Sequence, residues 1–148
     1  MKTKLTCSKV YSDLPFAHRQ PNHDGHCAHI HGHNWSFKFT FEADTIDECG
    51  FVVDFGKLKW LKKFIDCNFD HTTVLNSSDP HLEHIRSALE PDGLITIVTV
   101  PDCSSEGLAS FLLDTVNVVI AQKTCGRVRV KSVEVIEDNK NSATATHA

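Results

Sequence analysis

The sequence lacks several features that would assign it to a specialised class of protein. It contains no apolar run long enough to span a bilayer, and its first residues lack the apolar core and cleavage site of a signal peptide. It has no basic run or basic helix face, and its net charge of -4 argues against nucleic acid as a main partner. We therefore expect a cytoplasmic protein that binds neither membranes nor nucleic acid.

Cysteine pairs of the Cys-x-x-Cys type are also missing. The six cysteines lie at positions 7, 27, 49, 67, 103 and 125. Because no export signal is visible and the chain is long enough to build its own core, we expect reduced thiols rather than disulfides. The missing spacing also argues against a structural cysteine-rich zinc site. Only Cys27 has neighbours that suggest chemistry.

The sequence shows no internal repeats, and its length fits one domain, residues 1–148. The hydrophobic pattern predicts strands at residues 3–11, 33–43, 94–100 and 127–137, and helices at residues 54–68 and from Ser104 to Gly126. Two amphipathic helices would then cover one face of a mostly antiparallel sheet, which is an α+β fold.

Several details of this pattern are specific enough to test. Strand 33–43 alternates aromatic and polar residues, which indicates one buried face. Residues 94–100 show no alternation, so we expect both of their faces to be buried. Pro15 marks a loop, and a short helix follows Asp79-Pro80 within the long connection 72–93. The apolar parity changes within strand 127–137, which predicts a bulge or a switch of face. The tail from Asn139 is an edge strand or disordered.

Histidine is concentrated in one stretch, since residues 26–33 hold four of the ten histidines. His31 and His33 lie two apart on a predicted strand, so their imidazoles share a face, which is how strands commonly offer a metal two ligands. Neutral imidazole suits zinc, and His18 is the natural third ligand. His29 has the same parity and is an alternative ligand. The competing interpretation is a set of scattered surface histidines.

Three further positions suggest chemistry. A Cys27 thiol beside a metal and histidines would have a lowered pKa and act as a base or nucleophile, although a small buried residue is the simpler interpretation. Asp70 can orient the His71 ring, or the two can be a solvated pair. Glu137 shares the parity of the apolar face of the last strand, so its carboxylate needs a partner, such as a ligand with two adjacent N–H donors.

In combination these motifs resemble the 6-pyruvoyltetrahydropterin synthase family. The motifs are Phe16-Ala17-His18-Arg19, Cys27-x-x-x-His31-Gly32-His33-Asn34, Gly50-Phe51-Val52-Val53-Asp54-Phe55, Asp70-His71 with Leu75-Asn76, Ser104-Ser105-Glu106-Gly107-Leu108-Ala109 and Val133-x-Val135-x-Glu137. They occur in the family's order over most of the chain. The three residues between Cys27 and His31 are similar to the bacterial 6-carboxytetrahydropterin synthase branch.

The resemblance implies a role for each candidate residue. The zinc ligands would be His18, His31 and His33. Cys27 would be the base at the substrate side chain, and Asp70 with His71 would form a second acid–base pair. Glu137 would bind the pterin ring, which Ser104 and Ser105 would flank.

The resemblance also implies a fold, an assembly and a reaction. The fold is the T-fold, or tunnelling fold, in which three subunits close their antiparallel sheets into a barrel and two trimers stack into a homohexamer with sites at subunit interfaces. The implied reaction converts 7,8-dihydroneopterin triphosphate to 6-carboxy-5,6,7,8-tetrahydropterin, acetaldehyde and triphosphate, on the route to queuosine. Alternatives are a 6-pyruvoyltetrahydropterin synthase, a related pterin side-chain lyase, or a catalytically idle protein that binds zinc or a pterin.

The sequence also departs from the family pattern. Asp138 follows Glu137 where relatives usually have threonine, and Cys103-Ser104-Ser105 replaces a proline-threonine motif. Residues 77–100 are longer than in compact bacterial relatives. Charge alone makes Arg19 and Lys38 candidates for binding the triphosphate.

Overall fold

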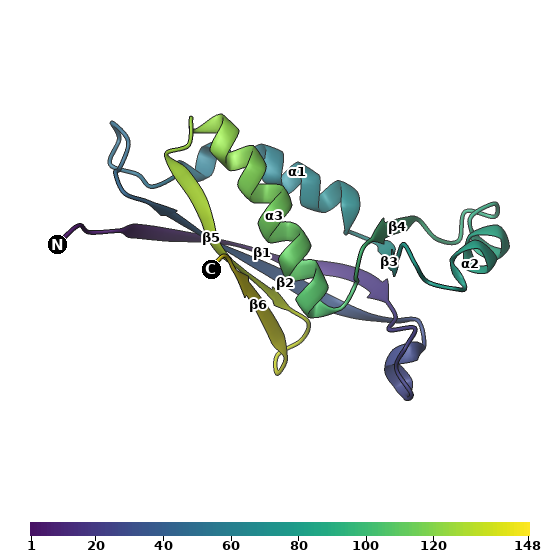
Figure 1. Ribbon diagram of the computed structural model, residues 1–148. Coiled ribbons are helices and arrows are strands. Elements are labelled where there is room, and N and C mark those ends of the chain that lie inside the picture. Colours follow the sequence, from purple (N-terminus) through teal and green to yellow (C-terminus); the bar gives the residue numbers. More distant parts are fainter.

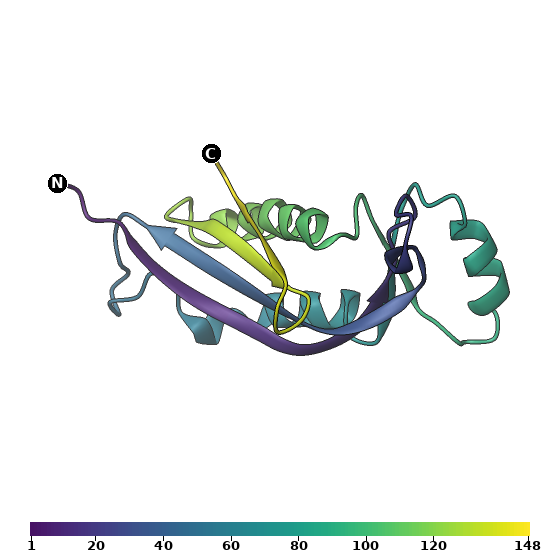
Figure 2. The same ribbon diagram turned by 90° about the horizontal axis from the view of Figure 1, so that it is seen from below.

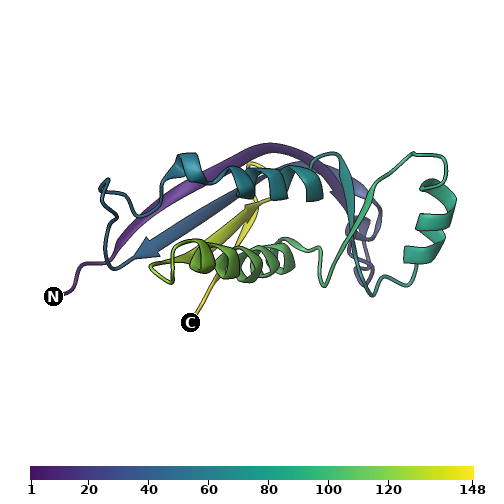
Figure 3. The same cartoon turned by 90° about the horizontal axis from the view of Figure 1, so that it is seen from above.

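One long antiparallel hairpin organises the fold. The computed structural model describes residues 1–148, and its hairpin pairs β1 (Leu5–His18) with β2 (His31–Ala43). Together they run as a curved ribbon along most of the molecule (Figures 2 and 3). The remaining strands are β3 (Thr72–Asn76), β4 (Ile97–Val100), β5 (Val128–Ile136) and β6 (Ser142–Thr146). All six form one sheet in the order β4-β3-β1-β2-β5-β6.

The sheet is mixed rather than purely antiparallel. β5 and β6 continue the antiparallel pairing beyond β2, whereas β3 pairs in parallel with β1, and β4 in parallel with β3. The predicted, mostly antiparallel sheet is therefore confirmed for four strands, and β3 and β4 extend it by parallel pairing.

Two helices cover one face of the sheet, as predicted. They are α1 (Lys59–Asn68) and α3 (Ser105–Lys123), which lie side by side against the same face (Figures 1 and 3). A third helix, α2 (Leu82–Leu89), stands apart at one end of the molecule (Figure 1). This architecture confirms the α+β class. None of the helices combines the length and the apolar character of a membrane span.

The core lies between the sheet and these two helices. The aromatic residues of β2, at positions 35, 37, 39 and 41, are fully buried. From the helices, Leu61 and Ile65 of α1 and Leu112 of α3 pack into the same core. Burying one such side chain contributes about 1.5–3 kcal/mol, so the predicted alternation marks the main source of stability.

Two strand predictions need correction because tertiary pairing overrides the local pattern. β1 continues through Pro15, where the sequence predicted a loop. A bulge precedes this proline, Asp13 has a φ of 58°, and β3 begins to pair with β1 only at Phe16, so the missing N–H interrupts no ladder there. β4 is an edge strand in which only Val100 is buried, so its unbroken apolar pattern did not reflect burial on both faces.

Other boundaries shift for local reasons. β3 lies inside the predicted connection 72–93; its short Thr-Thr-Val-Leu-Asn sequence is buried on both faces and shows no alternation. Asp54 caps a separate 3-10 helix, Phe55–Lys57, rather than α1 itself. The Ser104 cap, the short helix after Asp79-Pro80, the bulge in β5 and an edge strand in the tail are confirmed.

Two phenylalanines provide a test of this core. Phe37→Ala removes a fully buried ring, and we expect the free energy of unfolding to fall by about 3–5 kcal/mol because a cavity remains. Phe51 is 47% exposed, so Phe51→Ala should change it by less than about 1 kcal/mol. Urea unfolding of both variants checks this, and equal losses would contradict the described core.

Candidate metal centre

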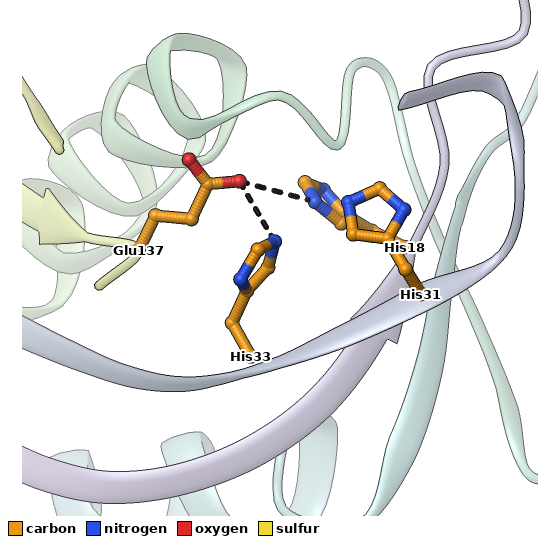
Figure 4. A group of neighbouring side chains, drawn as sticks. All are labelled: His18, His31, His33 and Glu137. Atoms are coloured by element: carbon orange, nitrogen blue, oxygen red, sulfur yellow. Dashed lines mark ion pairs between the residues drawn. The ribbon is translucent and has the colours of Figure 1, made fainter. Parts of the chain in front are cut away.

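Strand pairing brings three histidines together. His18 is the last residue of β1 and lies directly opposite His31, the first residue of β2. His33 follows two residues later on the same face of β2. The centre of the His18 ring lies 4.7 Å from the centre of the His31 ring and 5.3 Å from the centre of the His33 ring (Figure 4). The hairpin register therefore builds the cluster.

A carboxylate completes the cluster. Glu137 directly follows β5, and its Oε1 lies 2.9 Å from His33 Nε2 and 3.5 Å from His18 Nε2 (Figure 4). One ligand atom from each of the four residues lies within 4.8 Å of the others. Sequence reasoning expected Glu137 to need a partner but did not place it beside the imidazoles. The pairing of β5 with β2 does so.

The donor set fits a metal ion. His18 is 3% exposed, and its Nδ1 lies 2.8 Å from the Cys103 carbonyl oxygen, which can only accept a hydrogen bond. The ring proton therefore sits on Nδ1, and Nε2 keeps its lone pair. The Nε2 atoms of His18 and His33 are buried and form no hydrogen bond, although Glu137 Oε1 lies close to both. Such an arrangement costs free energy unless another group binds these nitrogen atoms.

Burial also keeps the first ligand neutral. Burial lowers the pKa of His18 below its ordinary value of 6.5, and the neighbouring His31 lowers it further, against the opposing effect of the Cys103 carbonyl. Neutral imidazole is the form that binds metals. His31 is oriented by its own contact, from Nδ1 to the backbone oxygen of His29 at 2.6 Å.

A pocket of about 490 Å³ opens beside the histidines. Six of the predicted site residues line it: His18, Cys27, His31, Ser104, Ser105 and Glu137. Sequence reasoning missed five other lining residues, which are Gln20, Glu106, Lys140, Asn141 and Ser142. Glu106 lies beside the predicted Ser104 and Ser105 at the start of α3, whereas no pattern in the sequence pointed to the turn between β5 and β6 as one wall of a site.

Cys27 reaches the pocket from outside the strands. It lies in a short 3-10 helix, His26–Ala28, between β1 and β2. His29 also precedes β2, so its shared parity with His31 and His33 was a wrong argument for a metal ligand. The Cys27 residue is nevertheless exposed and lines the pocket. The backbone of His29, rather than its ring, contacts His31.

Asp70 and His71 lie outside this pocket. Asp70 Oδ1 lies 2.7 Å from His71 Nδ1, so the predicted contact within the pair is present. Both side chains are exposed, His71 has a φ of 58°, and neither residue lines the pocket beside Cys27. Within one chain the structure does not bring this pair to the histidine cluster.

The two cations proposed from charge alone have other surroundings. Arg19 lies against the fully buried carboxylate of Asp79, with Nε and Oδ2 3.4 Å apart. Lys38 lies opposite Glu134 in the register of β2 and β5. Neither lines the pocket, whereas Lys140 does and is its one lysine or arginine.

Comparison with known proteins places this site in a known class. The chain has a T-fold and carries a candidate metal centre, and the model of the 6-pyruvoyl tetrahydropterin synthase family matches residues 7–148. The chain therefore belongs to the 6-pyruvoyl tetrahydropterin synthase family, whose members are pterin-processing enzymes, and the resemblance read from the motifs is confirmed.

Individual relatives agree with this assignment. A 6-carboxy-5,6,7,8-tetrahydropterin synthase from Rickettsia typhi is 39% identical over 71 residues, which are 47% of this chain and 51% of the relative. The chain spans about half the length of the curated relatives it matches.

Solved structures extend the likeness over the whole chain. An uncharacterised protein from Wolinella succinogenes superposes with a TM-score of 0.81 at 25% identity, covering 99% of both chains. A 6-pyruvoyl tetrahydropterin synthase from Caenorhabditis elegans has a TM-score of 0.66 at 22% identity, covering 99% of this chain and 97% of that one, and shows the same fold.

The buried His18 predicts a pH dependence of the metal-free protein. Because its folded pKa is lowered, the unfolded chain takes up a proton near pH 6.5 that the folded chain refuses. Stability should therefore fall as the pH drops below this value, by up to about 1.4 kcal/mol per pH unit from this group. Urea unfolding with a chelator between pH 7.5 and 5.5 measures the slope, which His18→Gln should reduce. An unchanged slope in the variant would refute the assignment.

Proposed function

We propose that this protein is a zinc-dependent enzyme that converts 7,8-dihydroneopterin triphosphate to 6-carboxy-5,6,7,8-tetrahydropterin, releasing acetaldehyde and triphosphate. It would act in the cytoplasm as a single domain, residues 1–148, on the route to queuosine and related 7-deazapurines. The observation that carries the proposal is the cluster of three imidazoles, two of which line one pocket together with Cys27, in a member of this family. The name of the Rickettsia typhi relative supports this particular product.

The zinc ligands in this proposal are His18, His31 and His33, the three imidazoles of the cluster. Three imidazoles with an open position are typical of a catalytic rather than a structural zinc site. A zinc ion bound there would acidify hydroxyl groups on the substrate side chain and stabilise negative charge that develops beside them. The remaining steps fall to the protein's own residues.

Cys27 is the proposed base. Cys27 is exposed and lines the same pocket as His18 and His31, so its sulfur can take a proton from the substrate side chain. Glu137 would accept the ring N–H and exocyclic amine of the pterin, because a carboxylate suits two adjacent donors. Ser104 and Ser105 line the pocket beside it, and the ammonium group of Lys140 offsets the negative charge of the phosphates.

Asp70 and His71 require a second chain in this proposal. The pair is exposed and lies outside the pocket of its own chain, so a neighbouring subunit is the natural place for it to act as an acid–base pair. The sheet also ends in two unpaired edges, β4 and β6, which are available to pair with other copies. A homohexamer with sites at subunit interfaces satisfies both observations.

The alternative enzyme is a 6-pyruvoyltetrahydropterin synthase or a related pterin side-chain lyase. The same residues would then act on the same substrate, and carbon–carbon cleavage would not follow. The three-residue spacing between Cys27 and His31 favours the carboxypterin product. A catalytically idle zinc- or pterin-binding protein would have no need of an accessible Cys27.

Product analysis tests the proposed reaction. Zinc-loaded protein incubated with 7,8-dihydroneopterin triphosphate should yield 6-carboxy-5,6,7,8-tetrahydropterin and acetaldehyde in equal amounts, measured by mass spectrometry. A pyruvoyl product would establish the alternative enzyme. Substrate that stays unchanged over a long incubation would eliminate both enzyme assignments.

Single substitutions separate metal binding from catalysis. His31→Ala should lose stoichiometric zinc because it removes one of three imidazole ligands, whereas Cys27→Ala should keep zinc and lose at least about 100-fold in turnover. His29→Ala is the matched control, since only the backbone of His29 contacts the cluster, and it should keep zinc. Zinc content by elemental analysis checks these outcomes, and full zinc in His31→Ala would refute the ligand assignment.

A further inference from the structure

A chain of hydrogen bonds leads from the end of β3 to the metal centre. The side-chain oxygen of Asn76, the last residue of β3, accepts a hydrogen bond of 2.7 Å from the backbone N–H of Cys103. The carbonyl oxygen of Cys103 in turn accepts a hydrogen bond of 2.8 Å from His18 Nδ1. Cys103 is fully buried and His18 nearly so, so water does not compete for these groups.

The backbone of Cys103 is held on both of its peptide planes. Asn76 holds the plane that carries its N–H, and the plane that carries its carbonyl also carries the Ser104 N–H, which donates to Asp102 Oδ1 over 2.9 Å. The thiol of Cys103 donates to the Arg19 carbonyl oxygen, the residue next to His18. The direction of the Cys103 carbonyl is therefore fixed by named contacts rather than by the loop alone.

The connection that follows Asn76 closes this network. The Asp79 N–H donates to the Asn76 carbonyl oxygen over 3.0 Å, and the buried Asp79 carboxylate faces the Arg19 guanidinium. The side chains of Asn76 and Asp79, which belong to one turn, thus contact Cys103 and Arg19 respectively. The Cys103 carbonyl oxygen accepts the hydrogen bond from His18, and Arg19 follows His18 in the chain. This gives Asn76 and Asp79 a task that neither the pocket nor the family match assigns to them.

We propose that Asn76 is a positioning residue for the metal centre, acting on His18 through the Cys103 backbone. The inference rests on the proposed function in that it takes His18 as a metal ligand. The Cys103 carbonyl keeps the proton of His18 on Nδ1 and sets the plane of the ring, so that Nε2 points toward the other donors. Without the Asn76 acceptor, the Cys103 N–H is left buried and unpaired, and its backbone must move to find a partner.

Three variants of the full chain test the proposal. Asn76→Ala removes the acceptor, and Asn76→Asp keeps an oxygen at the same place. Asn117→Ala is the matched control, because the Asn117 side-chain oxygen also accepts a backbone N–H, from Val130 over 2.9 Å, and ties α3 to β5 away from the histidines. All three metal-free proteins are titrated with Zn²⁺ against a chromophoric chelator, and their stabilities are measured by urea unfolding.

We expect Asn76→Ala to weaken zinc binding by about 10–100-fold, the usual effect of losing a group that orients a metal-bound histidine. Asn76→Asp should restore the affinity to within a few-fold of the wild type. Asn117→Ala should lose stability but bind zinc as the wild type does.

Two results would overturn the proposal. Wild-type zinc affinity in Asn76→Ala would show that the network does not act on the metal centre. An equal loss of zinc affinity in Asn76→Ala and Asn117→Ala would show that Asn76 acts only through the stability of the fold. In both cases the zinc site of the wild type stands. If the wild-type protein itself binds no zinc, the metal centre of the proposed function fails and this inference fails with it.

Discussion

The register between β1 and β2 is the constraint on which the rest of the structure depends. It sets His18 opposite His31 and, through the two-residue repeat of a strand, adds His33 to the same face. Farther along β2 the same repeat buries the aromatic side chains under α1 and α3. A slip of one residue would turn both the core residues and the histidines to the other face. Stability and the candidate metal centre are therefore set by one alignment of two strands.

Much of this was predictable from the sequence, and the exceptions have physical reasons. The alternation in β2, the two long helices and the grouping of His18 with His31 and His33 follow from local patterns that match the structure. β3 was missed because a short strand buried on both faces carries no period, and β4 was misjudged because an unbroken apolar run does not distinguish an edge strand from a central one. The longer β1 depended on a bulge that accommodates Pro15.

The site was harder to predict where it depends on segments distant in the sequence. Glu137 meets the imidazoles only because β5 pairs with β2, and Lys140 lines the pocket only because β6 turns back along β5. The buried pairing of Arg19 with Asp79 joins the end of β1 to a connection far along the chain, and charge alone did not predict this contact. Contacts of this kind have no signature in composition or spacing.

The position of Cys27 in a 3-10 turn, rather than on β2, separates two parts of the site mechanically. The segment that carries the thiol begins after His18 and ends before His31, so it is a loop whose two ends are anchored at candidate metal ligands. Inserting or deleting residues within it changes how far the sulfur reaches over the pocket. The spacing of the imidazoles is unaffected, because the strands hold it. In this architecture, loop length can diversify the chemistry performed on a bound molecule while the metal centre is inherited unchanged.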